Sequence, residues 1–155
     1  MINIQQLIDL EYATDTRKSR RKGTNSTQEF FTPWTIVKKM CDKIPQSDWS
    51  NPEKTFLEPS FGNGNFVLAI IYYRLNAGID WKTTLSTLYG VELMEDNLIE
   101  CKERVIELLD AMGVEYNKQE ALYIMEHNLV CSDFFKWNFD EWRPYTEDEL
   151  KRKKK

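Results

Sequence analysis

The chain has 155 residues, a formal net charge of −4 and 41% hydrophobic residues. This length allows one domain at most, and the hydrophobic content is enough for a buried core, which excludes a disordered chain. The three cysteines are far apart and lack CxxC spacing, and His127 is the sole histidine, so we expect neither a disulfide framework nor a zinc site. With no apolar run of roughly 20 residues and no secretory signal, we expect a cytoplasmic protein.

The first 27 residues combine a short amphipathic helix or arm with a polar loop. The helix is expected over Met1–Tyr12, and the loop follows over residues 13–26. Clustered cations can bind phosphate whatever the net charge, so a DNA contact is one reading of this loop and a solvated segment is the other. The basic residues concerned are Arg17, Lys18, Arg20, Arg21 and Lys22.

A helix is predicted to follow the loop. Thr32 is placed to cap it and Pro33 to occupy its first position, which are favoured places for these residue types. Ile36, Val37 and Met40 recur on one face, which indicates that this helix packs against another surface.

The chain is organised around the stretch from Phe56 to Phe66. Its pattern predicts a buried strand that ends at Glu58, a tight turn over residues 59–64, and a helix that Asn65 caps and that runs to about Asn76. A strand, a glycine turn and a helix N-terminus form the nucleotide-binding corner of an open α/β sheet. An ordinary strand-to-helix turn is the alternative.

The residues around this turn favour a cationic ligand over a phosphate. A phosphate-binding loop ends in Gly-Lys-Ser/Thr, which is absent, and Val67 stands where a dinucleotide fingerprint needs a third small residue. The carboxylate of Glu58 repels a pyrophosphate and attracts an ammonium or sulfonium centre. S-adenosylmethionine carries both cations and no phosphate, so it is the ligand that we expect.

Two further strands and two helices are predicted downstream. The strands are expected over Thr84–Leu93 and His127–Cys131, and the helices over Glu95–Met112 and Lys118–Met125. Right-handed crossovers would give a parallel sheet in the order three, two, one. The expected fold class is therefore α/β, with a partial Rossmann-like sheet and flanking helices.

Acidic residues end the second and third predicted strands as well as the first. Because the carboxyl ends of parallel strands share one edge, Glu92 and Asp133 should lie near the glycine turn. Glu92 can accept from both ribose hydroxyls, Asp133 from an adenine amino group, and Phe134 and Leu93 can cover the two faces of the base. The alternatives are a helix-cap neighbour for Glu92, a turn acid for Asp133 and a core ring for Phe134.

In this order, the motifs resemble the adenine-specific DNA methyltransferases of the gamma arrangement, which use S-adenosylmethionine. Phe30–Pro33 resembles their N-terminal cofactor motif, Glu58–Phe66 the main cofactor loop, Tyr89–Leu93 the ribose-binding strand end, and Cys131–Phe134 the adenine-contact motif. The resemblance covers residues 28–135. It implies a cofactor site made by Phe31, Thr32, Pro33, Glu58, Pro59, Gly62, Gly64, Phe66, Glu92, Leu93, Asp133 and Phe134.

The catalytic motif of that family, Asn/Asp-Pro-Pro-Tyr/Phe, is absent, and Arg143-Pro144-Tyr145 lacks its amide and second proline. We therefore expect a cofactor-binding domain over residues 28–135, an aromatic and basic tail over 136–155, and no catalytic residue. The implied activity is methyl transfer to the adenine amino nitrogen in double-stranded DNA, together with a missing C-terminal part or partner chain. Alternatives are a non-catalytic cofactor-binding or interaction module and, more weakly, an RNA or protein-glutamine methyltransferase.

Overall fold

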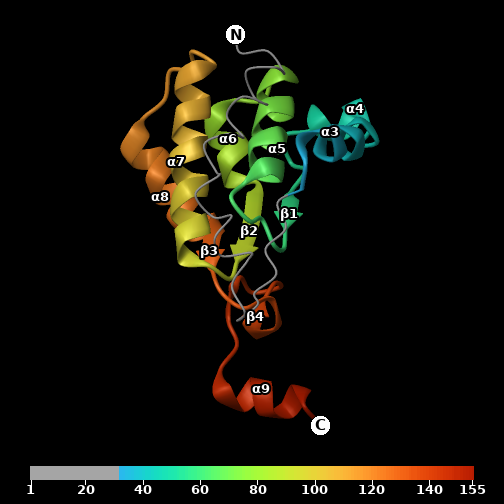
Figure 1. The fold of residues 1–155 in the computed structure, drawn as a ribbon, viewed down its shortest axis with the longest axis vertical. Coiled ribbons are helices and arrows are strands. Elements are labelled where there is room, and N and C mark those ends of the chain that lie inside the picture. Colours follow the sequence, from blue (N-terminus) through green and yellow to red (C-terminus); the bar gives the residue numbers. More distant parts are fainter. Residues whose placement is uncertain (1–31) are drawn as a thin grey trace.

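The structure is a computed structural model that describes residues 32–155. Its centre is a parallel sheet of β1 (Phe56–Glu58), β2 (Leu88–Glu92) and β3 (Leu129–Cys131), in which β2 lies between the other two (Figure 1). Helices connect and flank the strands. The prediction of an α/β chain with a parallel sheet and flanking helices is confirmed.

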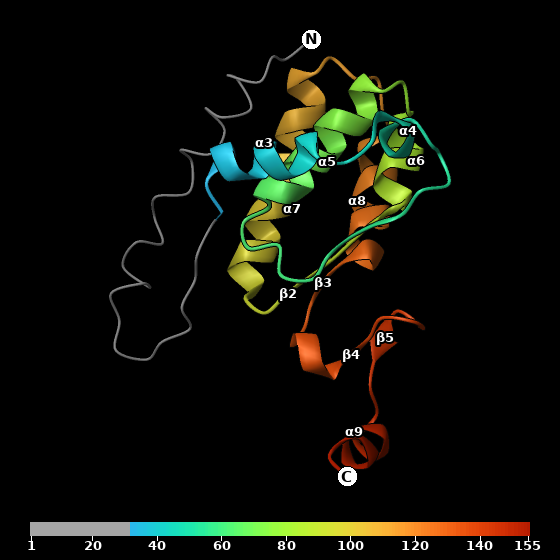
Figure 2. The ribbon, with the colours of Figure 1, turned by 90° about the vertical axis from the view of Figure 1, so that its right-hand side faces the viewer.

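Within residues 32–155, six helices precede or connect the three strands, and Figure 2 shows them gathered at one end, with the C-terminal elements at the other. They are α3 (Trp34–Asp42), α4 (Gln46–Trp49), α5 (Asn65–Asn76), α6 (Trp81–Ser86), α7 (Glu95–Ala111) and α8 (Lys118–Asn128). The predicted helices that became α5 and α7 agree with these bounds to within about one residue. No helix within residues 32–155 has both the length and the apolar character needed to cross a membrane.

Two strands are shorter than their sequence patterns indicated. The second does not begin at Thr84, which lies in α6, because the side chain of Asp80 accepts a hydrogen bond from the Thr83 amide at 2.9 Å and starts a helix there. The third begins at Leu129, because α8 continues to Asn128. The Asn128 side chain donates to the Leu85 carbonyl oxygen at 3.2 Å and so fixes the end of α8 against α6.

The N-terminal ends of α3 and α5 differ from the predictions. Pro33 is the N-cap of α3, not its first residue, and no side chain caps this helix. Gly64 is the N-cap of α5, and Asn65 is its first residue. Asn65 does not cap because its side chain bonds to other elements, as described below.

The buried face of α3 also differs from the predicted one. Trp34, Val37 and Cys41 are buried, whereas Ile36 and Met40 are exposed. Val37 alone was placed correctly. Trp34 dominates the choice of face because it buries more apolar surface than the other side chains of the helix.

The two faces of the sheet are covered differently. In a parallel pair, residues in register point to the same face, so Leu88, Gly90 and Leu129 share one face and Leu57 and Tyr89 the other. Leu88 and Leu129 belong to the main hydrophobic core, to which α3 and α5–α8 contribute. On the opposite face Leu57 is 50% exposed. The main core therefore lies on the face of Leu88 and Leu129.

The C-terminal tail is ordered and lies beyond the carboxyl ends of the strands (Figures 1 and 2). A 3-10 helix (Phe134–Lys136) leads into an antiparallel pair of β4 (Trp137–Asn138) and β5 (Arg143–Pro144), followed by α9 (Glu147–Lys153). A capping box of Thr146 and Glu149 begins α9, and Arg143 donates to both carboxylate oxygens of Glu149.

Candidate functional site: the carboxyl edge of the sheet

The carboxyl ends of the three strands meet at one edge of the sheet. Glu92 is in register with Cys131, and the Ser132 amide donates to the Glu92 carbonyl oxygen at 2.9 Å, so the segment that carries Asp133 begins beside Glu92. The loop after β1 returns to the same edge, where the Phe61 amide donates to the Val91 carbonyl oxygen at 3.2 Å. The structure thus brings the glycine loop, Glu92 and the start of the Asp133 segment together.

Both glycines of the loop after β1 have left-handed backbone angles. Gly62 has φ 56° and Gly64 has φ 103°, a region that side-chain-bearing residues rarely adopt. A Cβ on Gly64 would lie 2.5 Å from Cys101 Sγ, so this glycine lets α7 approach the start of α5. Its first role is therefore helix packing, which then fixes the position of the loop.

A buried arginine on α7 holds the glycine loop from below. Arg104 Nη1 donates to the Asn63 carbonyl oxygen at 3.0 Å and to Asn65 Oδ1 at 2.9 Å. Asn65 Nδ2 in turn donates to the Thr32 carbonyl oxygen at 2.9 Å. The Thr32-Pro33 segment is thus tied to the loop, although Pro33 itself is exposed.

Asn63 contributes a buried donor within the loop. Its side chain is 1% exposed, and its Nδ2 has no hydrogen-bond partner among residues 32–155. Buried polar atoms are nearly always paired in proteins, so this amide calls for an acceptor.

Glu58 and Glu92 make the carboxyl edge of the sheet electronegative. Burial raises the pKa of Glu58, and the charge of Glu92 raises it further, while a 3.2 Å hydrogen bond from the Ser60 amide works in the opposite direction. Burial likewise raises the pKa of Cys131, with added contributions from Glu95 and Glu92. Two carboxylates close enough to interact electrostatically favour a cationic ligand and disfavour a phosphate.

Glu92 is held in a defined orientation by its neighbours. Its side chain is 6% exposed, and its two oxygens accept from the Leu93 amide and from Asn97 Nδ2, both at 2.9 Å. These two contacts orient the carboxylate group. Asn97, in the first turn of α7, therefore positions the acid.

Asp133 follows the third strand, and its predicted contact with an adenine amino group stays a prediction. Asp133 Oδ1 accepts from the Phe135 amide at 2.9 Å and begins the 3-10 helix, which is the turn-acid alternative. Phe134 is exposed, with its ring centroid 5.0 Å from that of Phe139, and is not a core residue. Leu93 is also exposed, at the end of β2.

The remaining predicted site residues divide into two groups. Pro59 is exposed beside Glu58, whereas Phe66 is half-buried and packs against the main core, which is a structural role. Phe31 and the basic cluster of Arg17, Lys18, Arg20, Arg21 and Lys22 lie outside the described residues. No group of side chains within residues 32–155 could hold a metal ion.

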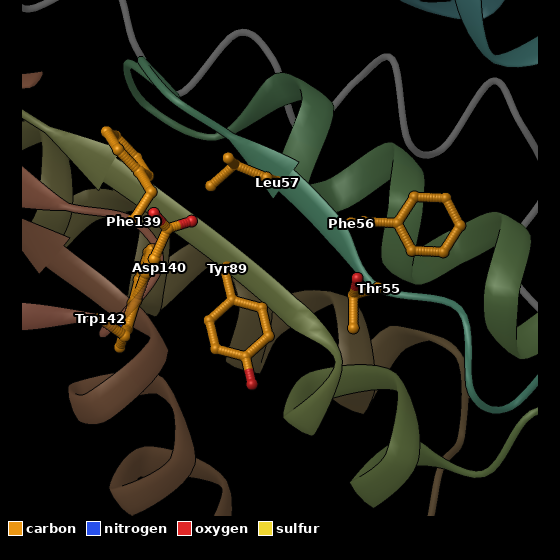
Figure 3. Close-up of a pocket in the computed structure, with 7 residues that line it drawn as sticks. All are labelled: Thr55, Phe56, Leu57, Tyr89, Phe139, Asp140 and Trp142. Carbon is orange, nitrogen blue, oxygen red and sulfur yellow. The ribbon is translucent and has the colours of Figure 1, made fainter.

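A separate pocket of about 330 Å³ lies on the sheet face of Leu57 and Tyr89 (Figure 3). Phe139, Asp140 and Trp142, from the connection between β4 and β5, form its other wall. Trp142 anchors that connection, because its Nε1 donates to the His127 carbonyl oxygen at 2.8 Å and its ring packs edge-on against Tyr89. Trp142 therefore covers part of this face of the sheet.

Sequence reasoning missed Asn97 and Arg104, which support the site from α7. Arg104 follows Cys101 by three residues and precedes Leu108 by four, so it lies on the buried stripe of the helix. That spacing was the available signal for a buried cation. Comparison of the chain with protein-family models found no match, and comparison with solved structures found no significant match.

Proposed function

We propose that the chain binds S-adenosylmethionine at the carboxyl edge of the sheet and is the cofactor-binding portion of an adenine-specific DNA methyltransferase with a Rossmann-like fold. The observation that carries the proposal is the convergence of the glycine loop, Glu58 and Glu92 at one sheet edge. Ligands of open α/β sheets bind outside the carboxyl ends of the strands. The choice of adenine in DNA rests on the motif resemblance.

Each part of the cofactor would meet a suitable group. Glu92, oriented by Asn97, would accept from the ribose hydroxyls, and the acidic pair it forms with Glu58 would favour the ammonium and sulfonium charges. The buried Asn63 amide would donate to the methionine carboxylate. Phe134 and Leu93, both exposed, would cover the adenine.

The residues that would activate the acceptor amine are expected on another stretch of polypeptide. Within residues 32–155, β1 and β3 each pair only with β2, so both edges of the sheet are open and one of them is formed by β1. Leu57 is half exposed beside that edge, and the pocket of Figure 3 adjoins it. Further strands would add to β1 and cover this face, as unpaired sheet edges generally require.

The same open edge favours a second candidate function. A non-catalytic module that binds the cofactor, or simply docks a partner by strand addition, would also leave β1 exposed and would need no Asn/Asp-Pro-Pro-Tyr/Phe motif. The two functions separate in a reconstitution assay. Methyl transfer to DNA on mixing the chain with a polypeptide that carries the catalytic motif supports the enzyme, and binding without transfer supports the module.

Isothermal titration calorimetry with S-adenosylmethionine tests the cofactor site itself. In Glu92→Gln one acceptor oxygen and the charge are lost, so we expect the dissociation constant to rise about tenfold or more. Glu103→Gln, at an exposed position of α7, is the matched control and should leave binding unchanged. Thermal melting of each variant separates a lost contact from a lost fold.

Equal affinities for wild type and Glu92→Gln, with both variants folded, would contradict the assignment of Glu92. Absence of any binding by the wild-type chain would remove the cofactor from the proposal altogether.

A further inference from the structure

A cleft of about 390 Å³ lies between the 3-10 helix, β4 and α9, beyond the carboxyl edge of the sheet. Its walls are mainly aromatic, and two lysines of the last residues lie at its rim. The residues used below are Phe134, Phe135, Trp137, Tyr145, Lys153 and Lys154.

The aromatic lining includes one broadly exposed ring. Phe135 is 78% exposed, although it packs edge-on against Phe134 with ring centroids 5.2 Å apart. The apolar surface of an exposed phenyl ring is in contact with water, and stacking against a planar group would bury it. Phe135 therefore offers a stacking surface that the described chain does not use.

A second observation also indicates a ligand with hydrogen-bond acceptors. Trp137 lines the cleft and is 8% exposed, and its Nε1 has no hydrogen-bond partner among residues 32–155. An indole N–H is a donor only, so the group it lacks is an acceptor. Bases and phosphates both supply acceptors.

The charge along α9 is separated in a way that suits a polyanion. Acidic residues occupy its first turn, whereas the last turn carries Lys151, Arg152 and Lys153 and is followed by two more lysines. Lys153 lies over the Tyr145 ring with its Nζ 3.7 Å from the centroid, which fixes one ammonium group at the rim of the cleft. The last turn of α9, with its cationic side chains, thus borders the aromatic surface.

We propose that this cleft binds a single-stranded DNA segment, with a base stacked on Phe135 and phosphates contacted by Lys153 and Lys154. Aromatic platforms beside cations are how proteins hold unpaired nucleotides without reading sequence. The proposal rests on the proposed function for the choice of DNA and extends it, because Phe134, which lines the cleft, is also a proposed cofactor-binding residue. An acidic peptide would be served by the lysines but would leave the stacking surface unused.

Fluorescence anisotropy on the full chain tests the proposal, with a labelled single strand of about twelve nucleotides, which lies within the span that one small binding fold covers. Phe135→Ala should weaken binding about tenfold or more, the loss typical of one base-stacking ring. Tyr123→Ala, at a 76% exposed position of α8 outside the cleft, is the matched control and should stay within twofold of wild type.

The lysines are tested through the dependence of affinity on salt. Lys153→Gln/Lys154→Gln should lower the slope of log affinity against log salt by about 1.4, since each phosphate contact on a single strand contributes about 0.7. Lys39→Gln/Lys43→Gln removes two exposed cations from the α3 region and should lower the slope by less.

Three outcomes would overturn the proposal: no binding of the single strand by wild type, equal losses in Phe135→Ala and Tyr123→Ala, or equally tight binding of a polyglutamate peptide that Phe135→Ala weakens as much. Calorimetry with S-adenosylmethionine on Phe135→Ala separates this result from the proposed function. If the chain binds the cofactor but not the single-stranded DNA, only the proposal for the cleft is contradicted. If it binds the single-stranded DNA but not the cofactor, the proposal for the cleft is supported and the proposed cofactor site is contradicted.

Discussion

Two buried arginines on neighbouring helices fix the two loops that flank β1, and the two loops have different roles. Arg74, on α5, is fully buried and donates to the carbonyl oxygens of Trp49 and Asn51, which precede β1, and to Thr87 Oγ1 at the entrance to β2. Arg104, on α7, donates to the loop that follows β1. The first lies at the amino ends of the strands and the second at their carboxyl ends.

The difference lies in what each guanidinium immobilises. Arg74 donates to backbone carbonyl oxygens of a connection that carries no predicted site residue. Burial lowers the pKa of Arg74, and its hydrogen-bond acceptors within residues 32–155 include no carboxylate. Arg104 fixes Asn63 and Asn65, and through Asn65 the Thr32 segment. Arg74 thus stabilises the scaffold, whereas Arg104 fixes the loop at the carboxyl edge of the sheet.

Replacement of Arg74 is the change with the largest expected effect. Arg74→Met keeps the length of the side chain but leaves buried carbonyl oxygens without donors, so the free energy of unfolding should fall by about 3 kcal/mol or more. Urea unfolding followed by fluorescence measures the loss. Cofactor affinity of the folded fraction should stay at the wild-type value.

Arg152→Met, at an exposed position of α9, is the matched control and should change the free energy of unfolding by no more than about 0.5 kcal/mol. A cofactor affinity that falls as far in Arg74→Met as in the corresponding variant of Arg104 would remove the distinction between the two arginines.

Arg104→Met should cost less stability and more function. The hydrogen bonds to the Asn63 carbonyl oxygen and to Asn65 Oδ1 are lost, and the glycine loop loses its support. Calorimetry should show S-adenosylmethionine binding weakened about tenfold, because the loop must then be ordered when the cofactor binds, and this ordering costs free energy. Unchanged affinity in a folded Arg104→Met variant would show that the loop keeps its shape without this residue.

The smallest effect is expected from Glu58, through its raised pKa. Because burial and Glu92 favour the protonated form in the folded chain, wild type loses stability as pH rises through that raised pKa, above the ordinary value of 4.5. A cationic cofactor favours the ionised form, so its affinity should rise over the same pH range. Glu58→Gln should flatten this pH dependence and weaken binding at pH 7 roughly fivefold.

Calorimetry across this pH range checks the prediction, with Glu107→Gln on the exposed face of α7 as the control. A pH dependence that persists in Glu58→Gln would assign it to a different group.

The sequence predicted the parts of the fold that depend on local patterns. The apolar run after Gly64 and the long amphipathic stretch from Glu95 specify α5 and α7, and the strand ends place Glu58 and Glu92 at one edge. The limits of β2 and β3 were missed because they depend on tertiary contacts. Asn128 reaches back to α6, and no local signal announces that bond.

The two arginines show why part of the site escaped prediction. Each lies on an otherwise apolar helix stripe, where the spacing indicates burial but not the partner. Their acceptors come from residues 13 to 41 positions away, so only the folded chain reveals which loop each one holds. The position of Asn97 beneath Glu92 is closer in sequence, and the first turn of α7 was a place to look for it.

The most direct test of the central claim is a titration of the isotopically labelled chain with S-adenosylmethionine, followed by backbone amide NMR shifts. We predict that the largest changes fall on Gly62, Gly64, Leu93 and Asp133, at the carboxyl edge of the sheet. Changes confined to the pocket of Thr55, Tyr89 and Trp142, or no changes at all, would contradict the account.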